Sequence, residues 1–315
     1  MSKEIRVIMG YPASGKTSIT KQFVDNGYHR INRDELGGSL DGVADKVKAA
    51  LGSHDKIVVD NTYIDRQSRK SLLKVAKDAK VDVICDWMQT SIEDAQYNAC
   101  WRMMERYGKV LSPDEIKAEK NAPNIFPLHV LYAYRTKFQP PEEKEGFAKI
   151  NEIAFVRKHP DGFNNKALIL DYDDTLRKSV GKHPWPEKIE DIEVLPKRKE
   201  TLTEWKKKGY LLLGASNQSA IAKGNFTIEE AVAMFEHTNK LLGHAVDFLF
   251  DPTKVPPLSS YNRKPCPGMG VQHIFKNKLD PKQCIVVGDQ KTDATFSKRI
   301  GANFEMAAKF FNDKV

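Results

Sequence analysis

Residues 4–20 read EIRVIMGYPASGKTSIT, and this stretch decides the fold of the first half of the chain. Its short apolar run with β-branched residues predicts a buried strand. The strand leads directly into the pattern G-x-x-x-x-G-K-[ST] from Gly10 to Thr17. In this pattern the glycines let backbone N–H groups turn around a phosphate, and the N-terminus of the following helix adds a positive dipole. The sequence therefore predicts a strand, a phosphate-binding loop and a helix.

The residue types in this loop also predict its cofactors. The Lys16 side chain can reach the β- and γ-phosphates, and the Thr17 hydroxyl occupies the position that binds Mg²⁺ in such loops. We therefore expect ATP and Mg²⁺ in the first half. The loop residues expected to contact the nucleotide are Gly10, Ser14, Gly15, Lys16, Thr17 and Ser18.

Polar residues downstream of the loop could serve the acceptor of a phosphoryl group. Asp34, in the string INRD, could take the proton of an attacking hydroxyl, although an aspartate there is also a common helix N-cap. Asp60 and Asn61 follow the apolar run KIVVD. Residues at such strand ends line the ligand crevice in doubly wound folds.

Arg102 and Arg106 are four residues apart in a predicted helix, so they share one of its faces. Such a pair could close over the transferring phosphates as a lid. The alternative is an ordinary basic face in contact with solvent, and the spacing alone leaves both open.

A second decisive strand, KALIL, is followed by Asp171-Tyr-Asp173-Asp174-Thr175. Two carboxylates that are two residues apart at a strand end point to one side. One can attack phosphorus while the other handles the proton of the leaving group, with Mg²⁺ between them. The motif predicts a phosphate-ester site, although calcium loops and acidic turns resemble it.

Three further groups follow later predicted strands. The Ser216 hydroxyl can hold phosphate oxygens, and Lys264 can balance the charge of the transition state. Asp289 can complete an oxygen-rich Mg²⁺ site. Because such strand ends meet at one edge of a parallel sheet, we expect these groups to lie near Asp171. Their neighbours Asn217 and Arg263 are expected to bind substrate.

Strands and helices alternate along both halves, as expected for α/β folds. Strands are predicted at 5–9, 56–60, 81–85, 166–171, 210–216, 247–250 and 284–289. Helices are predicted after Lys16, at 66–79, 92–106, 112–120, 127–136, 197–208, 228–241 and 268–278, and from 293. The polar stretch RKHPDGFNN (157–165) is typical of a linker. We therefore expect two domains, 1–156 and 166–315, each with a doubly wound parallel sheet.

The composition limits the class of protein and the cofactors that we expect. Among 315 residues, 40% are hydrophobic and 29% charged, which is normal for globular proteins. The net charge of +8 would help to bind a polyanion such as nucleic acid. The four cysteines form no CxxC pair and the eight histidines show no metal spacing, so zinc is not expected. The sequence has no bilayer-length apolar run and no signal-peptide pattern, which predicts an intracellular, cytoplasmic protein with no membrane partner.

The strings GYPASGKTS, INRDELGG, VVDNTYIDRQSR, EDAQYNACWR and YAYRTKFQPPEEKEGF occur in this order over nearly all of residues 1–155. Together they resemble the kinase domain of the polynucleotide kinase-phosphatases, and the vertebrate DNA-repair enzyme more than the bacteriophage one. The resemblance implies that Lys16 and Thr17 serve ATP and Mg²⁺. It also implies that Asp34 is the general base for a 5′-hydroxyl and that Arg102 is the lid arginine.

The same resemblance places Asp60 and Asn61 in the wall of the acceptor site. The bacteriophage enzyme has a phosphate-contacting arginine three residues after its base, and that position is Gly37 here. Arg33 and Arg66 are the candidates to anchor the acceptor instead.

The motifs of the second half, over about residues 166–305, resemble the haloacid-dehalogenase phosphatase superfamily. The strings SNQSAIAKG and RKPCPGM resemble the subgroup that contains polynucleotide 3′-phosphatases and the histidinol- and heptose-phosphate phosphatases. The implied architecture is a P-loop kinase fold followed by a haloacid-dehalogenase-like Rossmannoid phosphatase fold.

This second resemblance also implies roles for individual residues. Asp171 would form the aspartyl-phosphate, and Asp173 would be the general acid and base. Ser216 and Lys264 would bind phosphate, while Asp171, Asp173 and Asp289 would organise Mg²⁺. Some relatives carry a zinc loop before RKP, but the corresponding DPTKVPPLSSYN has no Cys or His.

The roles of two residues near the expected nucleophile stay open. The superfamily's usual glycine after the second aspartate is Asp174 here, which could raise neighbouring pKa values or simply face solvent. Trp185, in the string HPWP, could stack a terminal base, although a loop-anchoring core role is the favoured interpretation.

The leading functional hypothesis is nucleic-acid end healing, in which a 5′-hydroxyl is phosphorylated and a 3′-phosphate is removed so that a ligase can seal the ends. The alternatives are a metabolic fusion of a small-molecule kinase with a sugar-phosphate phosphatase, and a non-catalytic P-loop module that switches with ATP. The sequence leaves open the choice between DNA and RNA, the preferred end structure and the oligomeric state.

Overall fold

The computed structural model describes residues 3–33, 39–119, 122 and 124–313. The chain divides into two compact units, residues 1–98 with 121–157 and residues 99–120 with 158–315. Residues 99–120, which the sequence analysis assigned to the first domain, pack with the second unit because Trp101 contacts Phe163 and Phe275. The domain limits 1–156 and 166–315 remain predictions.

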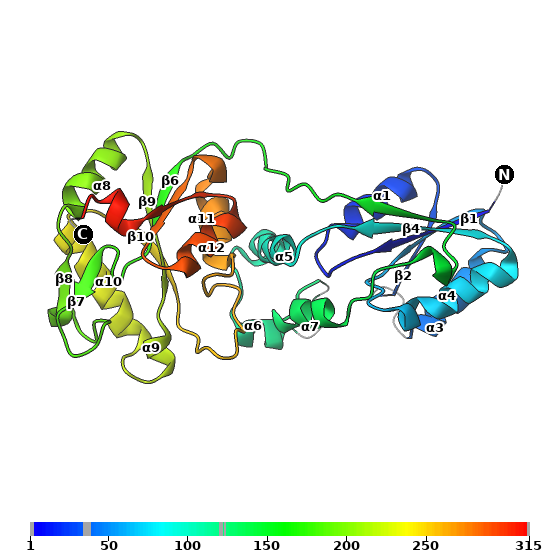
Figure 1. The fold of residues 1–315 in the computed structure, drawn as a ribbon, viewed down its shortest axis with the longest axis horizontal. Coiled ribbons are helices and arrows are strands. Elements are labelled where there is room, and N and C mark those ends of the chain that lie inside the picture. The colour runs from blue at the N-terminus through cyan, green and yellow to red at the C-terminus, as the bar shows by residue number, and fades with distance from the viewer. Residues whose placement is uncertain (1–2, 34–38, 120–121, 123, 314–315) are drawn as a thin grey trace. The chain divides into compact units, whose positions relative to one another are not determined.

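The first unit is built on a five-stranded parallel sheet in the order β2-β3-β1-β4-β5. Figure 1 labels β1, β2 and β4 of this sheet. Its strands are β1 (Glu4–Met9), β2 (His29–Asn32), β3 (Lys56–Asp60), β4 (Asp82–Met88) and β5 (Lys149–Ile153). Its helices are α1 (Lys16–Asp25), α3 (Leu40–Ala50), α4 (Arg66–Ala79), α7 (His129–Lys137), the 3₁₀ turn η1 (Glu143–Glu145) and the first part of α5 (Ile92–Tyr107). Because β1 lies between β3 and β4, its side chains Ile5 and Val7 are fully buried in the core.

Local sequence explains where the helices of this unit begin. The Ser39 hydroxyl accepts a hydrogen bond from the Gly42 amide and caps α3. Asp65 and Ser68 form a reciprocal capping box at the start of α4. Such caps satisfy backbone N–H groups that have no partner inside the helix.

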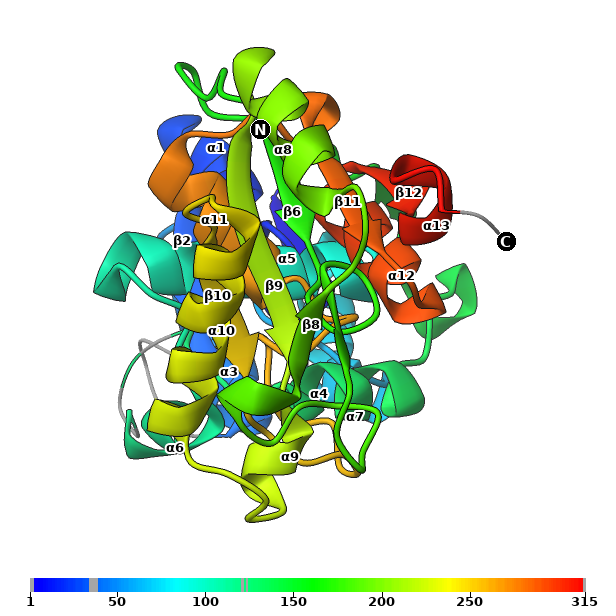
Figure 2. The same cartoon turned by 90° about the vertical axis from the view of Figure 1, so that its left-hand side faces the viewer.

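The second unit is built on another five-stranded parallel sheet, in the order β10-β9-β6-β11-β12. Figure 2 shows β9, β6, β11 and β12 side by side. The strands are β6 (Ala167–Leu170), β9 (Leu211–Asn217), β10 (Asp247–Asp251), β11 (Ile285–Gly288) and β12 (Asn303–Met306). A separate antiparallel ribbon pairs β7 (Arg177–Ser179) with β8 (Ile192–Val194).

The helices of the second unit surround a core centred on β6, whose residues Leu168 and Leu170 are fully buried. They are α6 (Pro113–Ala118), α8 (Arg198–Lys207), α9 (Ser219–Ala222), α10 (Ile228–Leu242), α11 (Gly268–Asn277), α12 (Lys291–Ile300) and α13 (Ala307–Phe310), with the 3₁₀ turns η2 (Ile189–Asp191) and η3 (Pro281–Gln283). Thr227 and Glu230 form a capping box at the start of α10. Asn165, at the end of the predicted linker, pairs with Leu279 of this unit.

The structure confirms two parallel-sheet α/β units and every predicted strand and helix, with shifts of a few residues at their ends. The sequence analysis did not predict β2, β5, α3, the β7–β8 ribbon, β12 or the short helices α9 and α13. In the described part of the chain, no helix combines the length and the apolar character needed to cross a bilayer.

Candidate active sites

The P-loop of the first unit connects β1 to α1 and wraps around the side chain of Lys16. The Lys16 Nζ atom donates hydrogen bonds to the carbonyls of Tyr11 at 2.7 Å and Gly10 at 3.2 Å. Gly10 has φ 148°, and a Cβ there would lie 2.9 Å from the Met88 Cβ, so only glycine fits. Gly15 caps α1 with φ 92°, which also favours glycine.

Two side chains outside the motif support this loop. The Thr90 hydroxyl donates to the Ser14 carbonyl, and the Asn98 amide donates to the Ala13 carbonyl, both at 2.8 Å. The motif pattern did not identify either residue, because both come from the β4–α5 region far along the chain. By contrast, Thr17 and Ser18 are exposed at the start of α1, where they are accessible to a nucleotide.

The predicted acceptor wall lies at the carboxyl ends of β2 and β3. The buried Asp60 carboxylate receives hydrogen bonds from Arg30 at 3.3 Å and Asn32 at 3.2 Å. The Asn61 side-chain oxygen accepts from the Thr62 amide. The predicted base Asp34 lies outside the described residues, as does Gly37.

Buried Arg69 of α4 fixes the loop that follows this wall. Its guanidinium binds both carboxylate oxygens of Glu145 at 2.8 Å and donates to the carbonyls of Tyr63 and Gln139. The loop after β3 is thereby tied to the segment after α7.

The candidate arginines of the first half lie in different environments. Arg66 forms ion pairs with Glu142 and Glu145, which compete with its suggested role as an acceptor anchor. Arg33 is exposed. Arg102 and Arg106 belong to the part of α5 that packs with the second unit. The roles of Arg33, Arg102 and Arg106 remain predictions.

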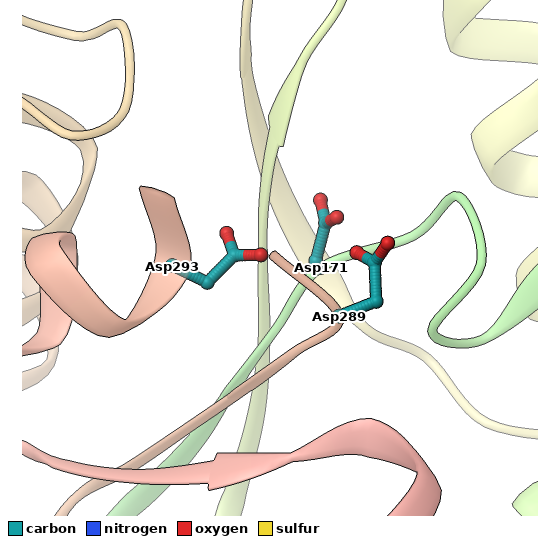
Figure 3. A group of neighbouring side chains, drawn as sticks. All are labelled: Asp171, Asp289 and Asp293. Carbon is teal, nitrogen blue, oxygen red and sulfur yellow. The ribbon is translucent and has the colours of Figure 1, made fainter. Parts of the chain in front are cut away.

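The phosphatase motifs converge in the second unit. Asp171 follows β6, Asp289 follows β11 and Asp293 lies in the first turn of α12. One carboxylate oxygen from each lies within 4.8 Å of the others (Figure 3). Gly288 makes this approach possible, because a Cβ there would overlap the Asp293 carboxylate.

Lys264 holds two of these carboxylates together. Its Nζ atom lies 2.8 Å from Asp171 Oδ1 and 2.6 Å from Asp293 Oδ1, and its side chain is almost fully buried. One ammonium group faces three carboxylates here, so the cluster keeps excess negative charge. The Asp289 Oδ1 atom is buried and has no hydrogen-bond partner among the described residues. Free carboxylate oxygens and excess negative charge both fit a hard cation such as Mg²⁺.

Burial dominates the electrostatics of this cluster. Burial, together with the neighbouring Asp293, raises the pKa of Asp171 to about 7 against the opposing effect of Lys264. Burial also raises the pKa of Asp289. Burial alone would lower the pKa of Lys264, but Asp171 and Asp293 raise it above its ordinary value. A bound divalent cation would favour the ionised carboxylates.

The Asp173 carboxylate is held away from this cluster. Arg177 Nε donates to its Oδ1 atom and Gln218 Nε2 donates to its Oδ2 atom, both at 2.8 Å. Gln218 also donates to the Ser216 hydroxyl at 3.0 Å. The side chain of Asp173 is not part of the three-carboxylate group, so its roles in Mg²⁺ binding and proton transfer stay predictions.

The predicted substrate contacts have structural partners of their own. Asn217 exchanges two hydrogen bonds with the backbone of Lys264, at 2.9 and 3.0 Å, and so positions the lysine. Arg263 donates to the Thr253 carbonyl at 2.9 Å. The phosphate-binding role of Ser216, which is almost fully buried, remains a prediction like those of Asn217 and Arg263.

A cavity of about 230 Å³ opens onto this site. Residues that the sequence analysis singled out line it, together with Asp293: Asp171, Asp173, Asp174, Trp185, Ser216, Asn217 and Lys264. Asp293 follows the predicted metal ligand Asp289 by four residues, but the sequence analysis did not predict it as a ligand. Asp174 has φ 58°, and its pKa is raised by burial and by Asp173.

The sequence analysis did not identify Gln218 and Arg177, because their contacts with Asp173 depend on the fold.

Residues 166–311, which contain this site, match the family model described as polynucleotide kinase 3 phosphatase. This half of the chain belongs to that family. The P-loop unit lies outside the match to the polynucleotide kinase 3 phosphatase family.

Curated relatives fall into two groups. The bifunctional polynucleotide phosphatase/kinase of Schizosaccharomyces pombe is 28% identical over 174 residues, which cover 55% of this chain and 36% of the yeast protein. The chain thus spans about a third of that relative's length. The D-glycero-beta-D-manno-heptose-1,7-bisphosphate 7-phosphatase of Haemophilus influenzae is 33% identical over 151 residues, which cover 45% of this chain and 79% of that protein.

A solved structure of the Pnkp1/Rnl/Hen1 RNA repair complex contains a chain that aligns with 97% of this chain and with 96% of its own length. The sequence identity is 16% and the TM-score is 0.31, a score that says nothing about activity.

Proposed function

We propose that the chain repairs nucleic-acid ends. The first half transfers the γ-phosphate of ATP to a 5′-hydroxyl of DNA or RNA, and the second half removes a 3′-phosphate. The observation that supports this most is the Lys264 bridge between Asp171 and Asp293, which lies in a family-matched phosphatase unit of a chain that also carries a P-loop.

In the phosphatase reaction, a carboxylate oxygen of Asp171 attacks phosphorus and the bond from phosphorus to the 3′-oxygen breaks. Asp173 gives its proton to the departing 3′-oxygen. A water molecule then attacks the aspartyl-phosphate, Asp173 takes the proton of that water, and inorganic phosphate leaves. Arg177 and Gln218 keep the Asp173 carboxylate in place during both steps.

Lys264 lies beside the nucleophile Asp171 and balances the negative charge that develops on the phosphoryl oxygens. Asp171, Asp289 and Asp293 would hold Mg²⁺, which supplies further charge neutralisation when bound.

In the kinase reaction, backbone N–H groups of the P-loop and Lys16 hold the β- and γ-phosphates. Asp34 takes the proton of the 5′-hydroxyl as its oxygen attacks the γ-phosphorus, and ADP leaves. Thr17 would hold Mg²⁺ at the phosphates, and Arg102 would close over them.

One experiment tests both activities. The protein is incubated with labelled ATP and 5′-hydroxyl oligonucleotides of DNA and RNA, and separately with strands that end in a 3′-phosphate. We expect label transfer to the 5′ end and release of inorganic phosphate from the 3′ end. Transfer to a free sugar, with no transfer to either polymer, would refute the proposal.

The second candidate function is a sugar-phosphate phosphatase fused to a small-molecule kinase. The similarity to the Haemophilus influenzae heptose-bisphosphate phosphatase favours it, because the alignment covers 79% of that protein. Hydrolysis of the heptose bisphosphate at a much higher kcat/KM than a 3′-phosphate strand would support this candidate over end repair.

Repaired ends need a ligase, so the reaction that consumes the product is strand sealing. A 5′-phosphate opposite a 3′-hydroxyl is the pair of ends that such a reaction joins. Use of ATP as the phosphate donor places the reaction inside the cell.

A further inference from the structure

The loop between β7 and β8 (residues 180–191) brings an aromatic side chain to the phosphatase cavity, and the proposed chemistry does not use it. Trp185 and Pro184 line the same cavity as Asp171 and Lys264. A ligand whose phosphate lies at Asp171 therefore has an indole ring within the same enclosure. Trp185 also packs against the core of the unit, so its body is anchored while part of it remains accessible.

The indole ring belongs to an aromatic and cationic group. The His183 ring lies nearly parallel to it, with centroids 5.1 Å apart and an angle of 12°. The Lys223 ammonium lies 5.6 Å from the indole centroid. His183 is 45% exposed, so the outer face of the stack is accessible to a further ring.

Packing alone does not account for this tryptophan. The Trp185 Nε1 atom is buried and has no hydrogen-bond partner in the described part of the chain. A buried indole N–H normally finds a partner, and leaving it unpaired costs about 1–3 kcal/mol. A phenylalanine would fill a purely structural position without that cost.

Hydrogen bonds hold the loop in a defined conformation. The Val180 amide donates to the Asp191 carbonyl at 2.8 Å, and the Glu187 amide donates to the Asp191 carboxylate at 3.1 Å. Asn225 donates to the Glu187 carboxylate at 3.1 Å. The side chains of Glu187 and Asp191 are therefore engaged locally, and a ligand would meet an ordered aromatic surface with little further ordering cost.

We propose that the His183–Trp185 pair is a stacking platform for the base of the 3′-terminal nucleotide whose phosphate lies at Asp171. This inference rests on the proposed function, because a sugar phosphate offers no base to stack. Every base has a π-face, so the platform accepts any terminal base and gives no sequence preference. The Lys223 ammonium beside the ring favours a polyanionic strand.

The test compares two DNA strands that both end in a 3′-phosphate. In one the last residue is an ordinary nucleotide, and in the other it is an abasic sugar. We expect Trp185→Ala to raise KM for the ordinary strand by about 5- to 150-fold, the size of one lost base–aromatic stack. Its KM for the abasic-ended strand should stay close to the wild-type value, and Trp185→Phe should restore most of the loss.

Two further variants control for folding. His183→Ala changes an exposed side chain and should also raise KM for the ordinary strand only. Trp205→Ala removes an indole that packs on Tyr210 and Phe310 outside the cavity, and it should not distinguish the two strands.

The outcomes separate this inference from the proposed function. If the wild-type protein has equal KM for both strands, or if Trp185→Ala and His183→Ala affect both strands equally, the platform is refuted while the phosphatase activity stands. If the wild-type protein hydrolyses neither strand but does hydrolyse a sugar phosphate, the proposed function falls and the platform falls with it.

Discussion

Replacing the proposed nucleophile should stabilise the metal-free protein. Asp171 is packed with Asp289 and Asp293 and shares one ammonium group, that of Lys264. Asp171→Asn removes one negative charge from this cluster while keeping the shape of the side chain. We expect the variant to lose phosphatase activity and to gain stability at pH 8 in the absence of Mg²⁺.

The magnitude follows from the pKa of Asp171, which burial raises from 3.8 to about 7. The folded state binds the proton more tightly than the unfolded chain, so stability falls as pH rises from the unfolded pKa through about 7. A gap of about 3 pH units corresponds to about 4 kcal/mol at most, since one unit is worth about 1.4 kcal/mol. The pKa already contains the attraction of Lys264 for the ionised carboxylate, so a gain of no more than about 4 kcal/mol is expected.

The assay is urea unfolding of the full chain with a chelator present, at pH 5 and at pH 8. Protection of the β6 amides from hydrogen exchange reports on the second unit. At pH 5, about one pH unit above the unfolded pKa of 3.8, only about a third of the penalty has developed, so the variant should gain much less there than at pH 8. A variant that is less stable than wild type at pH 8, or that gains equally at both pH values, would refute the electrostatic argument.

Three other changes test the remaining assignments. Asp34→Ala should abolish kinase activity and spare the phosphatase, and Asp171→Ala should do the reverse; loss of both activities from one change in a folded protein would contradict two separate sites. Asp289→Asn should raise the Mg²⁺ concentration for half-maximal phosphatase activity at least about tenfold, with kinase activity in the same preparation as the control, and an unchanged requirement would exclude Asp289 as a ligand. Arg69→Met should lower the free energy of unfolding of the first unit by about 3–5 kcal/mol, because Glu145 loses its buried partner; urea titration measures this, and an unchanged midpoint would count against the clamp.

The central strands of both sheets could be predicted from the sequence, whereas of the edge strands only β10 was predicted and β2, β5 and β12 were not. Strand β6 (ALIL) is apolar throughout and β1 (EIRVIM) is apolar over its last three residues, because neighbouring strands flank both strands on either side. By contrast, β2 (HRIN) and β5 (KINEI) lie at the edges of their sheet and carry polar residues. Their strand conformation depends on pairing with β3 and β4, which no local pattern records.

The residues of the candidate site were also only partly predictable from the sequence. Asp171, Lys264 and Asp289 follow predicted strands, so topology alone brings them to one edge of the sheet. Arg177 and Gln218 act through hydrogen bonds to a side chain, which depend on rotamers and packing rather than on sequence spacing. Sequence reasoning therefore found most of the charged centre, and missed Asp293 and the groups that orient Asp173.

Any Cβ at Gly288 would overlap the Asp293 carboxylate. This steric limit has a consequence for the evolution of the site. Drift at this position is limited by space rather than by chemistry, since even the smallest side chain would push Asp293 away from Asp171 and Asp289. A lineage that replaces this glycine should therefore lose the close approach of the three carboxylates while retaining all three aspartates. Such a descendant would look intact when its aspartates are aligned, yet it would lack the arrangement on which the proposed phosphatase reaction depends.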